Sequence, residues 1–317
     1  MWKPELLAPA KNLERLKVAV TYGADAVYVG GQKYGLRTRA DNFSDYDLEY
    51  GVNFAHENHA KVYLTLNAFL HDDDFEGLAE YCQFLESISV DGVIVSDLGV
   101  LRVVKRSSNL DIHLSTQASC LNSYAGQMWK QFGVKRLIVG REVSVVEGGA
   151  IRAQTGVDVE MFVHGAMCMA FSGNCTISNF TAGRDSNRGG CIQSCRFPYQ
   201  LADKRDDRPV TFMSSKDLWG IHQVGGFFEH QICSLKIEGR MKSSFYVAVA
   251  CRAYRQVIDA YGEGRLTPEM LNQIVAELES IPHRDYDSAS LETPAGSNSV
   301  YKQLESSRGT QIGRAHV

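Results

Sequence analysis

The sequence predicts a (β/α)8 barrel, and two observations support this prediction. Short apolar and β-branched runs recur along the chain, and few of them alternate with polar residues, which is typical of parallel strands buried on both faces. The stretches between these runs carry apolar residues at helical spacing. An open, doubly wound sheet is the alternative arrangement. The predicted strands are Leu6–Ala10, Ala26–Gly30, Val62–Asn67, Gly92–Asp97, Ile112–Thr116, Arg136–Gly140, Val159–His164 and Ser234–Gly239.

The composition is that of an ordinary globular protein. The 317 residues include 33 Lys and Arg against 37 Asp and Glu, and 44% of them are hydrophobic. These values exclude collagen-like, coiled-coil and wholly disordered chains. There is no apolar run long enough to span a membrane, and the N-terminus lacks the layout of a signal peptide. We therefore expect a cytoplasmic protein that does not bind membranes. The net charge of -4 leaves nucleic acid open as a partner, because a local basic face can bind it.

The predicted barrel has one unusual crossover and a polar C-terminal region. We expect the barrel to occupy residues 1–265, with a cysteine-rich insertion at 165–233 between strands seven and eight. In a barrel, this insertion would leave the C-terminal face, where active sites are built. A helical extension is expected over 266–282. Residues 283–317 are polar and serine-rich, which predicts a linker or disorder. Residues 311–317 look like a translated adapter, so we expect a truncated chain with an artefactual end.

Four of the eight cysteines lie within residues 168–195, with the spacing C-x6-C-x15-C-x3-C. In a cytosolic chain, clustered thiols are more typical of metal ligands than of disulfides. Zinc sites usually have tight cysteine knuckles at both ends, and only the last pair here comes close. A [4Fe–4S] cluster accepts looser spacing, so it is the favoured cofactor and zinc is the alternative. The predicted ligands are Cys168, Cys175, Cys191 and Cys195, with Cys233 as an alternative fourth ligand.

Polar side chains follow the predicted strands, and in a barrel they would all face one mouth. We expect Glu142 or His164 to act as general acid or base. Lys236 and Glu238 share one face of a strand, so they are either catalytic or paired with each other. The remaining residues are candidates for binding a carboxylate or phosphate, or for positioning substrate. They are Arg37, Arg39, Asn67, Gln117, Arg141 and Arg240.

Several motifs resemble the signature of the collagenase-like peptidase family of unknown catalytic type. The strongest surround the cysteines: EMFVHGAMC at 160–168, SGNCTIS at 172–178 and NRGGCIQSCRFPY at 187–199. SLKIEGR at 234–240, ELLAPA at 5–10 and GADAVYVG at 23–30 extend the resemblance over most of the chain. Members of this family often carry a further small β-domain at the C-terminus.

The resemblance implies two kinds of activity. The family is named for peptidase activity against collagen. Members with the most similar layout act in oxygen-independent hydroxylation of the tRNA wobble uridine, of ribosomal RNA or of a ubiquinone precursor. For those members, the resemblance implies a [4Fe–4S] cluster on this cysteine pattern and, for RNA, prephenate as the hydroxyl donor. The implied partners are tRNA or another RNA and the small donor molecule, with or without a partner subunit.

The motifs of known peptidases are weak in this sequence. His56 and His59 are spaced i,i+3, not as in the zinc-protease motif H-E-x-x-H, and there is no G-x-S-x-G elbow. A Cys168–His164 nucleophile is conceivable, but Cys168 belongs to the four-thiol pattern. We therefore favour iron–sulfur-dependent tRNA hydroxylation, giving 5-hydroxyuridine. The alternatives are a peptidase, a ubiquinone-precursor hydroxylase and a zinc-stabilised RNA-binding protein.

Overall fold

The computed structural model describes residues 2–36, 42–200 and 209–302, and within them a closed parallel barrel. Each barrel strand pairs in parallel with the next, and the last pairs with both β7 and β1, which closes the sheet. The predicted (β/α)8 fold is therefore confirmed. The barrel strands are β1 (Glu5–Pro9), β2 (Ala26–Val29), β3 (Lys61–Leu66), β4 (Gly92–Val95), β5 (Asp111–Leu114), β6 (Arg136–Ile138), β7 (Asp158–Ala166) and β9 (Ser234–Ile237).

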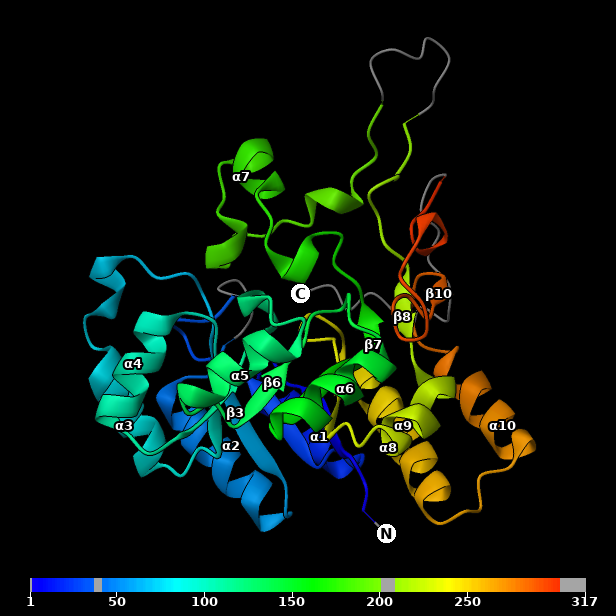
Figure 1. The fold of residues 1–317 in the computed structure, drawn as a ribbon, viewed down its shortest axis with the longest axis horizontal. Coiled ribbons are helices and arrows are strands. Elements are labelled where there is room, and N and C mark those ends of the chain that lie inside the picture. The colour runs from blue at the N-terminus through cyan, green and yellow to red at the C-terminus, as the bar shows by residue number, and fades with distance from the viewer. Residues whose placement is uncertain (1, 37–41, 201–208, 303–317) are drawn as a thin grey trace.

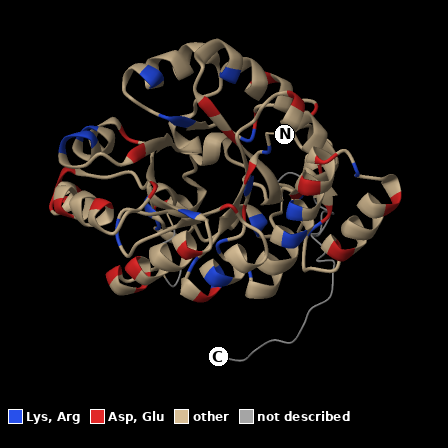
Figure 2. Cartoon of the chain, turned by 90° about the horizontal axis from the view of Figure 1, so that it is seen from below, with Lys and Arg blue, Asp and Glu red and all other residues tan. Residues whose placement is uncertain are grey.

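Helices surround the strands, as the views from the side and from below show (Figures 1 and 2). Most of them begin at an Asn, Asp or Ser whose side chain accepts a hydrogen bond from a backbone N–H in the first turn, which satisfies a donor that the helix leaves open. Asp97, one of these residues, is thus a helix cap. The ring consists of α1 (Leu13–Thr21), α2 (Asp45–Glu57), α3 (Leu78–Ser87), α4 (Leu98–Ser107), α5 (Ser123–Gln131), α6 (Val145–Thr155), α8 (Val224–Glu229) and α9 (Ser244–Gly262).

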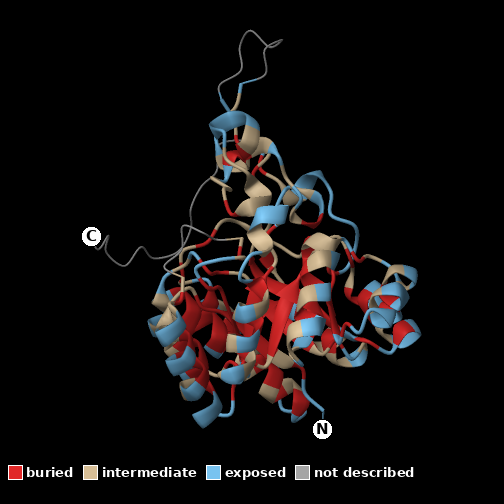
Figure 3. Ribbon diagram, turned by 90° about the vertical axis from the view of Figure 1, so that its left-hand side faces the viewer, coloured by how far each residue is buried: buried red, intermediate tan, exposed pale blue. Residues whose placement is uncertain are grey.

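The buried residues concentrate in the barrel and on the inner faces of the helices (Figure 3). β2, β4, β6 and β9 are buried at every position, as the nearly continuous apolar runs predict for strands covered on both sides. Helix α9 is the longest and contributes Tyr246 and Tyr254 to the core. Among the described residues, no helix combines the length and the apolar character needed to cross a membrane.

The segment between β7 and β9 rises beyond the carboxyl ends of the strands (Figures 1 and 3). Its projecting part, as far as the structure describes it, contains α7 (Ile177–Ala182), three short 3-10 turns and β8 (Asp217–Trp219), which pairs antiparallel with β7. The chain then returns to the ring as α8. The range predicted as an insertion, 165–233, therefore includes the barrel's own helix as well as the projecting part. The turns are η3 (Phe171–Gly173), η4 (Ser186–Arg188) and η5 (Ser194–Arg196).

Residues 283–302 are ordered, which corrects the expectation of a linker or disorder there. After α10 (Pro268–Leu278), β10 (Tyr286–Asp287) pairs in parallel with β8. The rings of Tyr286 and Trp219 lie 4.0 Å apart, and Leu291 and Tyr301 are buried. A few widely spaced aromatic and apolar side chains hold this segment against the rest of the protein. Because they show no helical or strand periodicity, the sequence pattern did not predict an ordered segment here. Residues 303–317, including the predicted artefactual end, lie outside the described residues. The remaining turns are η1 (Asp72–Phe75), η2 (Thr116–Ala118), η6 (Ile221–Gln223) and η7 (Ser297–Ser299).

Candidate active site

A cavity of about 300 Å³ lies where the barrel mouth meets the projecting segment. Its floor and sides come from the carboxyl ends of the strands, and its other wall comes from residues 166–196. The position matches the place where barrel enzymes build their active sites. Candidate residues that line it are Asn67, Gln117, Arg141, Lys236, Glu238, Arg240 and the four cysteines of the insertion.

All four cysteines predicted as ligands line this cavity. The backbone N–H of Ile177 donates to Cys175 Sγ at 3.4 Å, and that of Gln193 donates to Cys191 Sγ at 3.4 Å. Burial raises the pKa of Cys195, and the three other thiols nearby add to this rise. Backbone donors to sulfur are favourable for thiolate ligands and tune the potential of iron–sulfur clusters.

The four thiols have the chemistry of metal ligands. A zinc ion takes four ligands around one point. A [4Fe–4S] cluster has an iron atom for each thiolate, so its ligands lie farther apart around a larger group. Cys168, Cys175, Cys191 and Cys195 all line one cavity, which suits the thiolate ligands of a cluster.

Cys233 lies at the other end of the barrel. Its N–H donates to the carbonyl of Val159 at 2.9 Å and its carbonyl accepts from the N–H of Glu5 at 2.8 Å, and both partners are at the amino ends of their strands. The cysteine-lined cavity is at the carboxyl ends. This corrects the expectation that Cys233 could replace Cys195, because the length of the barrel separates them. Cys233 adjoins the last strand in sequence, but it does so at the amino end of that strand.

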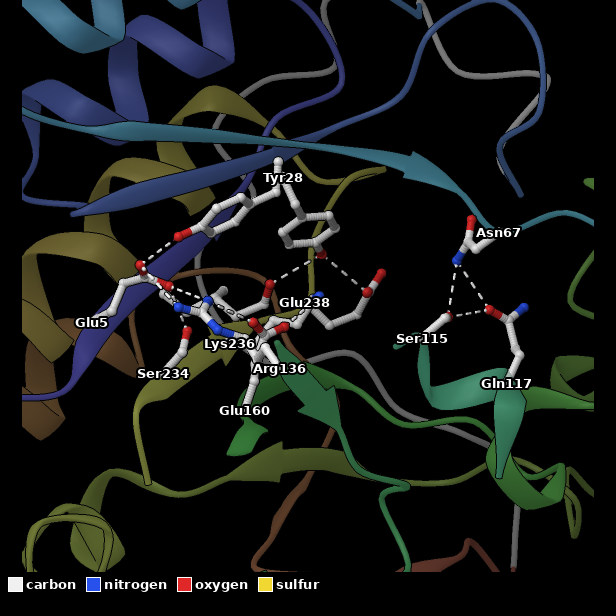
Figure 4. Close-up of polar contacts among 12 residues, drawn as sticks. Glu5, Tyr28, Asn67, Ser115, Gln117, Arg136, Glu160, Ser234, Lys236 and Glu238 are labelled. Atoms are coloured by element: carbon white, nitrogen blue, oxygen red, sulfur yellow. Dashed lines mark hydrogen bonds and ion pairs between the residues drawn. The ribbon is translucent and has the colours of Figure 1, made fainter. Parts of the chain in front are cut away.

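A network of ion pairs fills the barrel below the cavity (Figure 4). Arg136 Nη1 lies 2.7 Å from Glu5 Oε1 and 3.1 Å from Glu160 Oε2, and Lys236 Nζ lies 2.7 Å from Glu160 Oε1. Burial lowers the pKa of Lys236, and Glu160 opposes this effect. The hydrogen-bonded ion-pair partner of Lys236 is thus Glu160 and not Glu238. Glu238 instead accepts a hydrogen bond from the Tyr28 hydroxyl at 3.2 Å.

Asn67, Ser115 and Gln117 form a hydrogen-bonded group on another side of the cavity, here called the amide trio (Figure 4). Asn67 Nδ2 donates to Ser115 Oγ at 3.2 Å and to Gln117 Oε1 at 3.0 Å. Ser115 Oγ donates to Gln117 Oε1 at 2.8 Å. The sequence pointed to the ends of β3 and β5, and the structure shows that their side chains hold one another.

Two arginines predicted to bind substrate also line the cavity. The guanidinium carbon of Arg141 lies 3.9 Å from the ring centre of Phe162, and Arg141 forms no ion pair within the described residues. Arg240 Nη1 lies 3.4 Å from Thr65 Oγ1 and is buried. With Lys236, they give this part of the cavity a cationic character suited to carboxylates or phosphates. Arg37 and Arg39 lie outside the described residues.

The structure places two predicted acid–base residues away from the cavity. The His164 ring is packed among Trp219, Tyr246 and Tyr254, and Nδ1 lies 3.4 Å from the Tyr254 hydroxyl. Burial lowers its pKa to about 3, so it is neutral and does not face the cavity. The register of β7 against β9 shifts between Phe162 and His164, which explains why the alternation of the strand fails there.

Glu142 does not line the cavity either, because it supports the loop that does. Its Oε1 accepts a hydrogen bond from the backbone N–H of Ser172 at 2.7 Å. Ser172 has a left-handed backbone, with φ of 50°, and lies between Cys168 and Cys175. This contact gives Glu142 a positioning role, which corrects the expectation of an acid or base at the reacting atoms.

Sequence reasoning missed Tyr28, Phe162, Glu5, Arg136 and Glu160. The first two provide rings beneath the cationic groups, with Lys236 Nζ 4.4 Å from the centre of the Tyr28 ring. The other three form the network. Charged residues inside runs otherwise predicted to be buried were the available signal, because a buried charge needs a partner.

Comparison with known proteins identifies the family. Residues 11–300 match the profile of peptidase family U32. The tRNA hydroxylation protein P1 of Bacillus subtilis is 44% identical over 93% of this chain and 72% of its own length. A collagenase of Porphyromonas gingivalis is 30% identical over 89% of this chain and 72% of its length. The solved structure of a U32 peptidase is 16% identical, covers 75% of this chain and 95% of its own length, and has a TM-score of 0.51, which supports the fold. The chain belongs to peptidase family U32.

Proposed function

We propose that this chain hydroxylates a pyrimidine of RNA without O₂, most specifically C5 of the tRNA wobble uridine, with prephenate as the hydroxyl donor and a [4Fe–4S] cluster. The observation that carries the proposal is that four cysteines and four cationic side chains, Arg141, Arg196, Lys236 and Arg240, line one cavity at the barrel mouth. The name of the Bacillus subtilis relative supports RNA as the substrate.

The overall exchange balances without a further reagent. The base loses hydrogen and gains hydroxyl at C5, which removes two electrons from it. The donor loses its hydroxyl group and gains hydrogen, so it accepts the same two electrons. Side chains do not carry out such chemistry alone, and enzymes use a cofactor for it. A bound cluster would supply one-electron transfer or a Lewis-acidic iron at the cavity wall, held by Cys168, Cys175, Cys191 and Cys195.

The residues of the chain would bind and orient the two substrates. Arg141 and Arg240 are suited to the carboxylates of the donor, because guanidinium groups bind carboxylates with paired hydrogen bonds. Lys236, held by Glu160, adds a third cation at the cavity floor. Phe162 supports the Arg141 guanidinium from one face. The projecting segment covers the mouth and would limit the access of water to the reacting groups.

Proteolysis is the second candidate function, favoured by the collagenase relative. In the described part of the chain, no serine or cysteine that lines the cavity is hydrogen-bonded to a histidine. His164, the nearest to Cys168 in sequence, lies among aromatic rings outside the cavity. A nucleophile without a base in reach lacks the arrangement that covalent catalysis uses. A ubiquinone precursor is an alternative substrate for hydroxylation at the same redox site.

Complementation tests the proposal. A bacterial strain that lacks its own hydroxylation genes would carry this gene, its Cys168→Ala variant or an empty vector, and would be grown without O₂. Mass spectrometry of tRNA nucleosides should show 5-hydroxyuridine, one oxygen atom heavier than uridine, with the wild type only. Absence of 5-hydroxyuridine from the tRNA of all three cultures, wild type included, would refute the proposal. If modification is absent and purified protein cleaves collagen peptides equally well with and without Cys168, proteolysis replaces it.

A further inference from the structure

The amide trio has two hydrogen-bonding groups left over. Gln117 Oε1 accepts from both Ser115 and Asn67, so the carboxamide orientations of Asn67 and Gln117 follow from the network. Asn67 Oδ1 is buried without a hydrogen-bond partner in the described part of the protein, and Gln117 Nε2 has none there either. Leaving a buried acceptor without a hydrogen bond costs folding free energy, and a ligand that donates to Asn67 Oδ1 would remove this cost. The trio therefore has one unused acceptor, on Asn67, and one unused donor, on Gln117.

The trio lies across the cavity from Lys236. It is at the ends of β3 and β5, whereas Phe162 and Lys236 come from β7 and β9, on the other side of the closed barrel. Of the cavity cations, Arg240 reaches the β3 side, where its Nη1 lies 3.4 Å from Thr65 Oγ1. Figure 4 shows the trio apart from the network around Glu160. Within the described residues, no charged side chain is hydrogen-bonded to it. An anion would favour the cationic side, so the amide side suits a neutral, planar group with its own donor and acceptor.

The trio is also fixed in place and tied to the cysteine loop. The backbone N–H of Ser115 donates to the Val95 carbonyl at 2.6 Å, and Ser96 Oγ donates to the Asn67 carbonyl at 3.2 Å. Asn174 Nδ2 donates to the Gln117 carbonyl at 3.3 Å. Asn174 directly precedes Cys175. A ligand held by the trio would consequently lie beside the proposed cluster ligands.

We propose that Asn67 and Gln117 recognise the Watson–Crick edge of the target pyrimidine, with Ser115 positioning both amides. This inference rests on the proposed function. With uracil, N3–H would donate to Asn67 Oδ1, and the carbonyl at C4 would accept from Gln117 Nε2. C5 is the ring atom next to C4 and is not part of the Watson–Crick edge, so it would stay free of the trio and face the cavity beside it. Enzymes that act on a base outside the helix commonly read this edge.

Binding of modified RNA tests the inference independently of catalysis. The probe is a fluorescent stem–loop RNA with a single uridine in its loop, and its partner carries 3-methyluridine there, which removes the N3 donor. Wild-type protein should bind the methylated RNA about tenfold more weakly, which corresponds to one lost hydrogen bond. Asn67→Ala removes the acceptor for N3–H and should bind both RNAs weakly and about equally. Gln127→Ala, which truncates an exposed amide on α5, should behave as wild type.

Equal binding of both RNAs by the wild type, or no binding of either, would overturn the inference. So would discrimination that persists in Asn67→Ala. The comparison of the two RNAs needs no mutation, so it does not depend on how well the variants fold. Discrimination in binding without hydroxylation in cells would refute the proposed function alone. Hydroxylation in cells with equal binding of the two RNAs would refute only this inference.

Discussion

Lys236 and Glu160 form an ion pair inside the barrel, with 2.7 Å between Nζ and Oε1. Glu160 is fully buried, and it also accepts from Arg136, which in turn pairs with Glu5. The network balances two carboxylates against two cations and joins β1, β6, β7 and β9. Lys236 also lines the cavity. The ion-pair network that links these four strands therefore also fixes the position of the Lys236 ammonium group at the site.

Replacing Glu160 should therefore destabilise the fold. Glu160→Gln removes the charge that neutralises Lys236 and Arg136, and breaking a buried pair in this way costs about 3–5 kcal/mol. Urea unfolding would measure the loss. Glu57→Gln, on the exposed end of α2, is the matched control and should change the free energy of unfolding by less than about 0.5 kcal/mol. Equal midpoints for the two variants would contradict the account of the network.

The protein should become less stable as the pH is lowered, because His164 is buried and neutral in the folded state. Burial lowers its folded pKa to about 3, whereas the unfolded value is near 6.5. The unfolded chain therefore binds a proton below pH 6.5 that the folded protein excludes. Neutral His164 therefore contributes fully to the free energy of unfolding above pH 6.5. This contribution is lost as the pH falls from 6.5 toward 3, and about 2 kcal/mol of it is gone at pH 5.

Urea unfolding at pH 7 and pH 5 would test this pH dependence against His164→Phe. The ring of phenylalanine suits the aromatic surroundings of Trp219, Tyr246 and Tyr254 and has no proton to bind. The variant should lose less stability between the two pH values than the wild type does. Parallel losses in the two proteins would show that His164 is not the group responsible.

The projecting segment should loosen when its contact with the barrel loop is removed. Arg188 pairs with Asp74 at 2.6 Å and donates to the Phe69 carbonyl at 2.7 Å, while the Phe69 N–H donates to the Asn187 carbonyl at 3.0 Å. Arg188→Ala should speed hydrogen exchange of the Phe69 amide. Arg152→Ala, on α6, should leave it unchanged. Unaltered exchange at Phe69 in Arg188→Ala would mean that other contacts hold the segment.

The cysteines should differ in their effect on bound iron according to their place in the fold. Cys191→Ser should lose the iron of anaerobically purified protein, since Cys191 lines the cavity. Cys233→Ser should retain it, since Cys233 lies at the amino end of β9. Iron assay and visible absorbance on both variants would check this. Loss of iron in folded Cys233→Ser would restore Cys233 as a candidate ligand.

The sequence was sufficient for the barrel and for the grouping of the four cysteines. Parallel strands covered on both sides must be apolar along their length, so runs such as Val62–Asn67 predicted them directly. The barrel topology then sends the segment after the seventh strand to the carboxyl-end face. That the four insertion cysteines line one cavity follows from these two steps, and the structure agrees.

Side-chain direction was harder to predict. His164 should have faced inward by alternation with Phe162, but the register shift in β7 turns it outward. The partner of Lys236 is on β7, and pairing between distant strands cannot be read from alternation within one strand. The ordered residues around Tyr286 likewise depend on contacts with Trp219, a residue distant in sequence.

Iron and acid-labile sulfide in anaerobically purified wild-type protein, with zinc assayed in parallel, test the central claim most directly. The account predicts about four iron and four sulfide per chain, both lost in a Cys168→Ala/Cys175→Ala variant. Stoichiometric zinc would instead make the cysteines a structural site. Either zinc or a well-folded protein without any metal would contradict redox hydroxylation of RNA at this cavity.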